Sequence, residues 1–271
     1  MMQNTLHYYI LSDSIGDTAM KVSKSVLAQF PNANTVLHKY NFISSDEHLS
    51  EILTSVNKYQ GLIFMTIVDD ALASIVEDYC KHNQLTCFNL IQPFIQEIQS
   101  RIGIQPSAKA GIQHELSDKY FNRIKAIEFC IAADDGQDLS LLSEAEVILL
   151  GISRTGKTPL SMYLGTLGHK VLNIPIIPEN TPPKELYNLD SQKIVGLINN
   201  VDTINKHREK RMLEFGMPIQ SRYCSKERVH QELTFAENLY QKLGCHILNV
   251  ADLSIEESAS LIIDKLNLPI Y

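Results

Sequence analysis

Eight consecutive residues in the second half of the chain fit the phosphate-binding pattern G-x-x-x-x-G-K-S/T without a mismatch. They are Gly151, Ile152, Ser153, Arg154, Thr155, Gly156, Lys157 and Thr158. The aliphatic run 147–150 predicts a buried strand before this loop, and apolar residues at helical spacing over 160–167 predict a helix after it. Because strand, loop and helix are the context in which this pattern binds nucleotides, we predict a phosphate site here. An ordinary βα turn is the alternative.

The residue types in this loop suit an anion. Both glycines are expected to allow φ > 0 and so bring backbone N–H groups close to a phosphate, and the start of the following helix adds unpaired N–H groups. Lys157 can reach the terminal phosphates, and the Thr158 hydroxyl can ligate Mg²⁺. Arg154 could stabilise charge on a phosphoryl group in transfer, although an exposed loop arginine is the alternative.

Two carboxylates, Asp134 and Asp135, follow an apolar segment and precede Gly136, upstream of the loop. One of them could hold Mg²⁺ or accept a proton from an attacking hydroxyl. A plain Asp-Gly turn, in which the carboxylate bonds only its nearby backbone, explains them equally well. The predicted catalytic residues are therefore Lys157, Arg154, Asp135 and Asp134, with 151–158 as the phosphate site and Thr158 as the metal ligand.

A basic stretch stands out in this acidic chain. Between Lys206 and Arg228, seven positive and three negative residues give a local net charge of +4. Arg208 and Arg211 are three residues apart and should share a helix face, and residues 217–225 are expected to form a mobile loop. The stretch is either a basic lid that closes over phosphates or a solvated helix face.

The first hundred residues alternate between strand and helix patterns. The predicted strands cover 6–11, 35–43, 61–68 and 87–90, and the predicted helices cover 19–30, 46–59, 70–82 and 94–102. This alternation predicts a parallel sheet with helices on both faces. The polar turn 12–18 follows the first strand, where open α/β sheets bind ligands, although a helix cap would also explain it.

The pattern lapses between Gly103 and Asn122, so we predict an N-terminal parallel-sheet α/β domain over 1–104, a linker over 105–123, and a C-terminal P-loop kinase-like α/β domain over 124–271. In the second domain the character of 124–133 is ambiguous. Helices are expected over 139–145, 184–189 after Pro182, 202–215 capped by Asp202, 226–243, and 255–266 with a Ser254–Glu257 capping box. Further strands are expected over 170–177, 194–198 and 246–250.

Composition narrows the class of protein. A net charge of −7 over 271 residues argues against a general nucleic-acid binder. No apolar run approaches the roughly 20 residues that span a bilayer, and residues 1–7 lack the layout of a signal peptide. Five scattered cysteines without a C-x-x-C pair suit a reducing compartment and give no zinc framework. We expect a cytoplasmic protein with no membrane or nucleic-acid partner.

Six groups of short motifs follow one another over nearly the full length of the chain. They are Ser12 to Gly16, Ala126 to Phe129 with Asp134 to Gly136, Gly151 to Thr155 with Lys157 to Ser161, Asn173 to Pro175 with Pro178 and Glu179, Pro182 to Leu186, and Ile255 to Glu257. In these motifs and their order the chain resembles the pyruvate, phosphate dikinase regulatory proteins, close relatives of the phosphoenolpyruvate synthase regulatory proteins. Gly156 stands where the family usually has serine, and Ala133 where a polar or aromatic residue is common; neither departure removes a group that the chemistry plainly needs.

The resemblance implies a bifunctional, ADP-dependent serine/threonine protein kinase. Such proteins transfer the β-phosphate of ADP to a threonine of the dikinase near its catalytic histidine, which inactivates it. They reactivate it by letting inorganic phosphate attack the phosphothreonine, which releases pyrophosphate. The implied cofactors are ADP, inorganic phosphate and Mg²⁺, and the family suggests a homodimer. The alternatives are the same chemistry on phosphoenolpyruvate synthase, a P-loop small-molecule kinase, or a nucleotide-binding switch without transfer chemistry.

Overall fold

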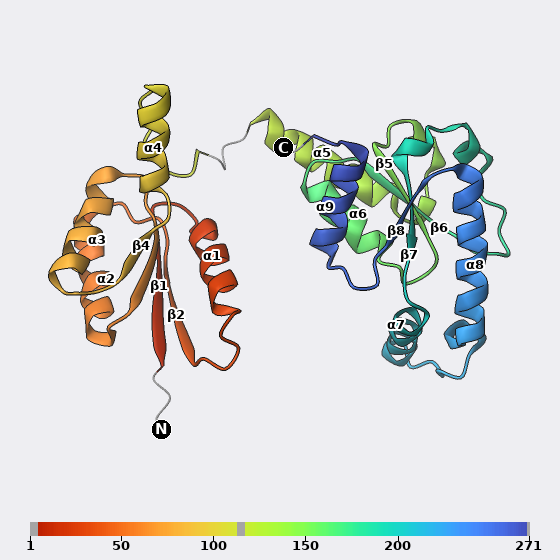
Figure 1. Cartoon of the computed structure of the whole chain (residues 1–271), viewed down its shortest axis with the longest axis horizontal. Helices are drawn as coiled ribbons and strands as arrows, with labels where there is room; N and C mark the ends of the chain where they lie inside the picture. The colour runs from red at the N-terminus through yellow and green to blue at the C-terminus, as the bar shows by residue number, and fades with distance from the viewer. Residues whose placement is uncertain (1–4, 113–116, 270–271) are drawn as a thin grey trace. The chain divides into compact units, whose positions relative to one another are not determined.

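A computed structural model of the chain describes residues 5–112 and 117–269. It divides into two compact units, Met1–Glu115 and Leu116–Tyr271 (Figure 1). Each unit contains one four-stranded parallel sheet with helices packed on both faces, which confirms the predicted α/β class. In the described part of the chain, none of the helices is both long and apolar enough to cross a membrane.

The first unit has the strand order β2-β1-β3-β4. Alternate residues of its central strand serve opposite faces of the sheet, as a period of two requires. Tyr9 and Leu11 pack into one core, whereas Tyr8 and Ile10 pack into the other with Ala19. The elements are β1 (Leu6–Ser12), α1 (Asp17–Leu27), β2 (Thr35–Tyr40), α2 (Asp46–Tyr59), β3 (Leu62–Thr66), α3 (Asp70–His82), β4 (Cys87–Asn89) and α4 (Gln92–Ile102).

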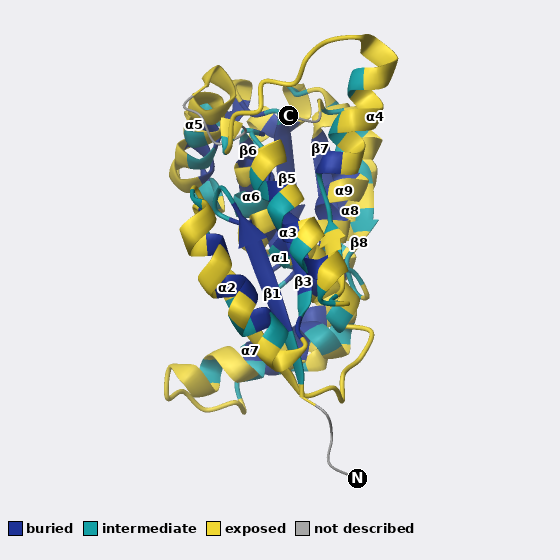
Figure 2. Ribbon diagram, turned by 90° about the vertical axis from the view of Figure 1, so that its left-hand side faces the viewer, coloured by how far each residue is buried: buried dark blue, intermediate teal, exposed yellow. Residues whose placement is uncertain are grey.

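The second unit repeats this arrangement with the order β6-β5-β7-β8. Ile148 and Leu150 of β5 face the core that α7 and α8 help to cover, and Val147 and Leu149 face the core under α6 and α9. Figure 2 shows β5, β6 and β7 largely buried and the outer sides of the helices exposed, whereas β8 at the edge of the sheet is only partly buried. The elements are α5 (Asp118–Ala132), β5 (Val147–Gly151), α6 (Lys157–Thr166), β6 (Val171–Pro175), β7 (Ile194–Ile198), α7 (Val201–Glu214), α8 (Lys226–Leu243), β8 (His246–Asn249) and α9 (Ile255–Leu266).

Several expectations about individual elements need correction. The ambiguous segment 124–133 lies almost entirely in helix α5, which begins at Asp118 behind the N-cap Ser117 and so includes the end of the predicted linker. The segments expected as helices over 139–145 and 184–189 are short 3₁₀ turns, η3 (Leu139–Ser143) and η4 (Lys184–Asn188). Helix α7 is capped by Asn200, which accepts from the Asp202 N–H, and not by Asp202.

Candidate active site

The predicted phosphate loop joins β5 to α6. Gly156 is the N-cap of α6 with φ 86°, as its role in the pattern requires. Gly151 ends the extended strand β5 and does not have positive φ, so the expectation that both glycines turn left-handed is wrong. Gly151 is needed for space, because a Cβ there would collide with the Thr155 hydroxyl. The second left-handed residue of the loop is Arg154, with φ 77°.

The backbone of this loop presents a set of free donors. Within the described residues, the amide N–H groups of Arg154, Gly156, Lys157 and Thr158 donate no hydrogen bond to the protein. They come from one tight turn and from the positive end of α6, so they can converge on one anion. This geometry favours a phosphate cradle over an ordinary βα turn.

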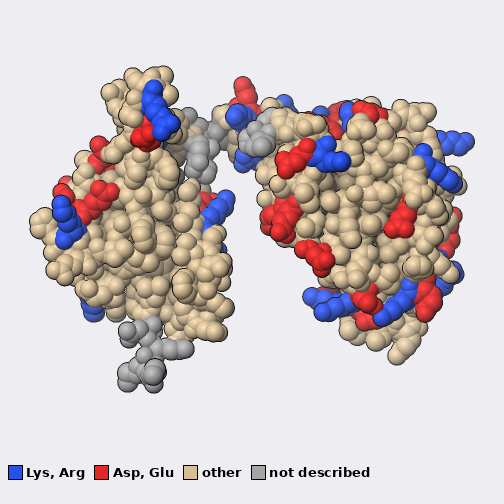
Figure 3. Space-filling model, viewed as in Figure 1, with Lys and Arg blue, Asp and Glu red and all other residues tan. Residues whose placement is uncertain are grey.

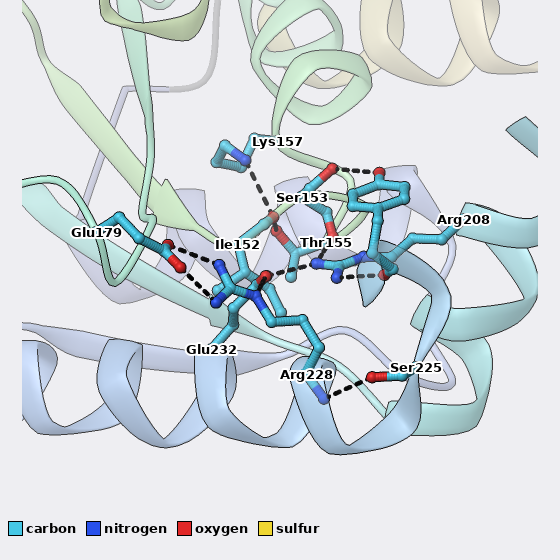
Figure 4. A network of polar contacts seen from close by, with 10 residues as sticks. Ile152, Ser153, Thr155, Lys157, Glu179, Arg208, Ser225, Arg228 and Glu232 are labelled. Atoms are coloured by element: carbon cyan, nitrogen blue, oxygen red, sulfur yellow. Dashed lines mark hydrogen bonds and ion pairs between the residues drawn. The ribbon is translucent and has the colours of Figure 1, made fainter. Parts of the chain in front are cut away.

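Lys157 lies at the base of the cradle and is only 6% exposed. Its Nζ donates to the Ile152 carbonyl oxygen at 3.1 Å, and the Thr155 hydroxyl donates to the same oxygen at 2.9 Å (Figure 4). Burial lowers the pKa of Lys157 to about 8, against the opposing effect of Asp135 and Asp134. A phosphate beside this buried ammonium group would offset the cost of its desolvation, so the side chain suits an anion.

The two carboxylates occupy different positions beside the loop. One oxygen of Asp134 accepts hydrogen bonds from the Thr158 hydroxyl at 3.1 Å and from Asn173 Nδ2 at 2.6 Å. Asp134 thus bonds residues far from its own turn, and the plain Asp-Gly turn is wrong for it. Asp135 has φ 52°, donates its N–H to Asn173 Oδ1 at 3.1 Å, and lines the cleft over the loop. Asn173 anchors both residues and was not predicted as part of the site.

A cleft of about 940 Å³ opens above the cradle within the second unit. One wall is the loop itself with Asp135, and Leu253 and Ile255 at the start of α9 contribute an apolar wall. Arg154 also lines the cleft and is partly buried, and its Nε atom has no hydrogen-bond partner among the described residues. Arg154 is therefore not simply an exposed loop arginine.

The basic stretch contributes to this cleft in part. His207, Lys210 and Arg211 of α7 line it, whereas Arg208 is fully buried and paired with Glu232. Arg208 and Arg211 thus have different surroundings, and neither a lid nor a solvated face describes Arg208. On the side of the unit seen in Figure 3, acidic and basic side chains are mixed over the region of α7.

The segment predicted as a mobile loop, 217–225, carries the 3₁₀ turn η6 (Arg222–Cys224). The Tyr223 hydroxyl in this turn hydrogen-bonds to Ser153 Oγ at 2.8 Å, which joins the segment to the phosphate loop. Sequence reasoning missed Tyr223, because no local pattern links residues 70 positions apart.

The residues beside the cradle fit Mg²⁺ without forming a ready-made cage. No group of three or more acidic, histidine or cysteine side chains suited to a metal occurs among the described residues. The Thr158 hydroxyl and the Asp134 carboxylate nonetheless place two oxygen donors together next to the loop. Mg²⁺ in phosphoryl-transfer sites commonly takes one or two protein oxygens and completes its shell with water and phosphate, so this pair suits it.

In the first unit, the polar turn 12–18 follows β1, and its side chains form hydrogen bonds with the end of the neighbouring strand β3 and the residues after it. Asp13 accepts from the N–H groups of Val68 at 2.6 Å and Asp69 at 3.3 Å, and Ser12 Oγ donates to the Thr66 carbonyl. No side chain caps α1, whose N-cap is Gly16. The capping explanation is therefore wrong, and the polar groups of Ser12 and Asp13 instead bond the end of β3 and the residues after it.

Comparison with known proteins identifies the family of this chain. A model of the family described as kinase/pyrophosphorylase matches residues 8–263. The chain belongs to this family. Among its relatives, a protein of Lactobacillus acidophilus is 40% identical, with 99% of this chain and 97% of that protein covered. A protein of Enterococcus faecalis is 41% identical over 96% and 94% of the two chains, and one of Clostridioides difficile is 39% identical over 97% and 95%.

These three members of the kinase/pyrophosphorylase family carry the name pyruvate, phosphate dikinase regulatory protein. The resemblance noted in the sequence motifs is thereby confirmed. The family description also agrees with phosphotransferase chemistry, because both a kinase and a pyrophosphorylase must bind the phosphates that they transfer or release.

Proposed function

We propose that this chain transfers the β-phosphate of ADP to a threonine of pyruvate, phosphate dikinase, and removes that phosphate by phosphorolysis. The observation that carries the proposal is the convergence of free amides, the buried Lys157 ammonium and the Asp135 carboxylate on one cleft. The names of the relatives support the dikinase as the protein substrate.

In the forward reaction the β-phosphate lies in the cradle, with the amides of Arg154, Gly156 and Lys157 donating to its oxygens. Asp135 accepts the proton of the threonine hydroxyl as its oxygen attacks the β-phosphorus. The bond from the β-phosphorus to the oxygen that bridges to the α-phosphate breaks, and AMP leaves. Lys157 and Arg154 stabilise the charge that spreads over the transferring oxygens, which is where such donors contribute most.

In the dephosphorylation reaction the same cradle holds the phosphoryl group of phosphothreonine. An oxygen of inorganic phosphate attacks that phosphorus, the bond to the threonine oxygen breaks, and pyrophosphate forms. Asp135 takes the proton of the attacking hydrogen phosphate and passes it to the leaving threonine oxygen. One anion site can therefore serve both reactions, because a phosphoryl group occupies the same position in each.

Mg²⁺ would be held by Thr158 and Asp134. When bound, it would neutralise part of the charge on the phosphate oxygens. The protein's own part is to keep the two oxygen donors adjacent to the cradle, and the hydrogen bond from Asn173 fixes the Asp134 carboxylate for this purpose.

The proposal is tested by incubating the protein with purified dikinase and ADP that is radiolabelled at its β-phosphate. We expect label on a dikinase threonine, loss of dikinase activity, and recovery of activity with release of labelled pyrophosphate on addition of inorganic phosphate. Lys157→Ala should lose both activities. Transfer to phosphoenolpyruvate synthase and not to the dikinase would mean that the synthase is the protein substrate. Label only on a small molecule, or no transfer to any acceptor, would overturn the proposal.

A further inference from the structure

Arg208 is the largest fully buried side chain in the described structure, with no solvent exposure, and it lies outside the predicted site. A buried guanidinium is stable only when it is paired and hydrogen-bonded. One Nη atom donates to Glu232 at 2.6 Å and to the Ser153 carbonyl oxygen at 3.3 Å, and the other donates to the Tyr223 carbonyl oxygen at 3.0 Å. The contact with Ser153 ties this buried charge to the phosphate loop (Figure 4).

The hydrogen bond to Ser153 fixes the direction of a peptide group. The Ser153–Arg154 peptide bond is trans, so the carbonyl of Ser153 and the N–H of Arg154 point in opposite directions. When Arg208 holds the carbonyl on its own side, the Arg154 N–H must point away from Arg208. That N–H is one of the free donors of the cradle.

This peptide needs support, because Arg154 has φ 77°. A non-glycine residue in the left-handed region is strained and keeps that conformation only when its surroundings enforce it. Two hydrogen bonds fix the preceding residue, Ser153. Arg208 donates to its carbonyl oxygen, and the Tyr223 hydroxyl bonds its Oγ atom at 2.8 Å. The guanidinium carbon of Arg208 also lies 4.5 Å from the centroid of the Tyr223 ring, so the two residues that bond Ser153 stabilise each other's position.

Arg208 belongs to a network of ion pairs with alternating charges. Glu232 bonds Arg208 through one oxygen and Arg228 Nε through the other, at 2.6 and 2.5 Å. Arg228 then forms two bonds of 2.6 Å with Glu179, in the segment after β6. These bonds lower the pKa of Glu179 to about 2. The chain joins α7, α8 and the segment after β6 behind the phosphate loop.

We propose that Arg208 is a positioning residue for the phosphoryl-transfer step: by holding the Ser153 carbonyl, it keeps the Arg154 amide directed into the cradle. Arg208 does not touch the phosphate itself. The inference rests on the proposed function, since it assigns Arg208 to the reaction at the same loop. The alternative is that the buried charges only hold α7 and α8 to the domain.

Arg208→Lys tests the proposal, because it keeps the charge but replaces the two Nη atoms that reach Ser153, Glu232 and Tyr223 by a single nitrogen without the planar fork. We expect a folded protein whose kcat for transfer to the dikinase falls about 10- to 100-fold, a typical effect of losing a residue that orients a site. The KM for the dikinase should not change. In ¹H–¹⁵N spectra, the Arg154 amide resonance should shift less on addition of MgADP than in the parent protein.

The matched control is Lys226→Met. Lys226 pairs with Asp202 at 2.5 Å, so it also joins α8 to α7, but its pair is exposed and does not contact the loop. This variant should keep the parent kcat and the parent Arg154 shift. The proposal is overturned if Arg208→Lys loses thermal stability while the folded protein keeps both the parent kcat and the parent Arg154 shift.

Two further arms keep the test decisive. If Arg208→Lys does not fold, Glu232→Gln takes its place, because it keeps the shape of the side chain but weakens the ion pair that holds Arg208. This variant should also have a lower kcat and a smaller Arg154 shift than the parent protein. Unchanged values of both would count against the proposal. If the parent protein transfers no phosphate to the dikinase, the proposed function fails. The Arg154 shift and the affinity for MgADP then decide the positioning role without any activity measurement.

Discussion

The Thr158 hydroxyl donates a hydrogen bond to the Asp134 carboxylate at 3.1 Å, across 24 positions of sequence. The contact joins the first turn of the helix after the phosphate loop to the turn that precedes β5. It brings together a hydroxyl and a carboxylate, which are ligands that Mg²⁺ accepts. The site is thus assembled from two segments on either side of the loop's own strand.

The first prediction concerns this pair. Thr158→Ser keeps the hydroxyl and should transfer phosphate at close to the parent rate, whereas Thr158→Val removes it at nearly constant volume. We expect Thr158→Val to need a higher Mg²⁺ concentration for half-maximal activity and to lose about 10- to 100-fold in kcat. A Mg²⁺ titration of initial rates checks this. Equal Mg²⁺ dependence in the two variants would remove Thr158 from the metal site.

The second prediction separates the two carboxylates. Asp135→Asn should lower kcat by about 10²- to 10⁴-fold, the usual contribution of a general base, and should leave the affinity for ADP nearly unchanged. Asp134→Asn should instead raise the requirement for Mg²⁺, because Asp134 is bonded to Thr158. Parallel rate and calorimetric binding measurements distinguish the two effects. If Asp134→Asn caused the larger fall in kcat at saturating Mg²⁺, the two roles would be exchanged.

The third prediction concerns Lys157, whose pKa burial lowers to about 8 from an ordinary value of 10.5. Below pH 8 the side chain is charged in both states and its burial opposes folding. Between pH 8 and 10.5 the unfolded chain binds more protons than the folded protein, so the free energy of unfolding rises with pH and the destabilising effect of the buried charge decreases. Lys157→Met should therefore raise the free energy of unfolding by about 2–3 kcal/mol at pH 7, while it abolishes transfer.

Chemical denaturation of both proteins at pH 7 and at pH 10 checks this, because the difference between them should shrink at the higher pH. The affinity of the parent protein for ADP should fall as pH rises through about 8, since the ammonium form binds phosphate. A difference in unfolding free energy that does not depend on pH would mean that the buried charge of Lys157 does not destabilise the folded protein.

The fourth prediction uses the left-handed backbone of Arg154. Arg154→Gly and Arg154→Ala both remove the guanidinium and should both slow transfer at least about 10-fold. Only glycine adopts φ near 77° without strain, so the glycine variant should be more stable than the alanine variant by about 1 kcal/mol. Melting curves of the pair measure this difference. Identical stabilities would show that the strain is relieved by movement of the loop.

Much of the fold follows from local signals in the sequence. The helices that begin at Asp46, Asp70, Lys226 and Ile255 have the predicted bounds, because each is preceded by a side chain that accepts from its first turn. The segment 124–133 was ambiguous because apolar and β-branched residues are mixed there, and packing against α6 and β6 decides the helix.

The loop, Lys157, Thr158 and the two aspartates could be predicted as site residues because they belong to short sequence patterns. Asn173, Tyr223 and Glu232 were missed because each acts through a contact that only the folded chain creates. Arg208 was assigned to a basic surface on the evidence of its charged neighbours, and the structure buries it instead. A single sequence does not reveal that Glu232, 24 positions later, neutralises it.

The four side chains behind the loop, Glu179, Arg228, Glu232 and Arg208, alternate in sign and balance one another. Removing one partner of a buried ion pair leaves an uncompensated charge, at a cost of about 3–5 kcal/mol. Replacing Arg208 with a neutral residue leaves these four positions with one excess negative charge and Glu232 with Arg228 as its remaining partner, and a neutral residue at position 232 would restore the balance. Among descendants of a common ancestor, we expect these two positions to change together or not at all, and covariation between them would record the constraint.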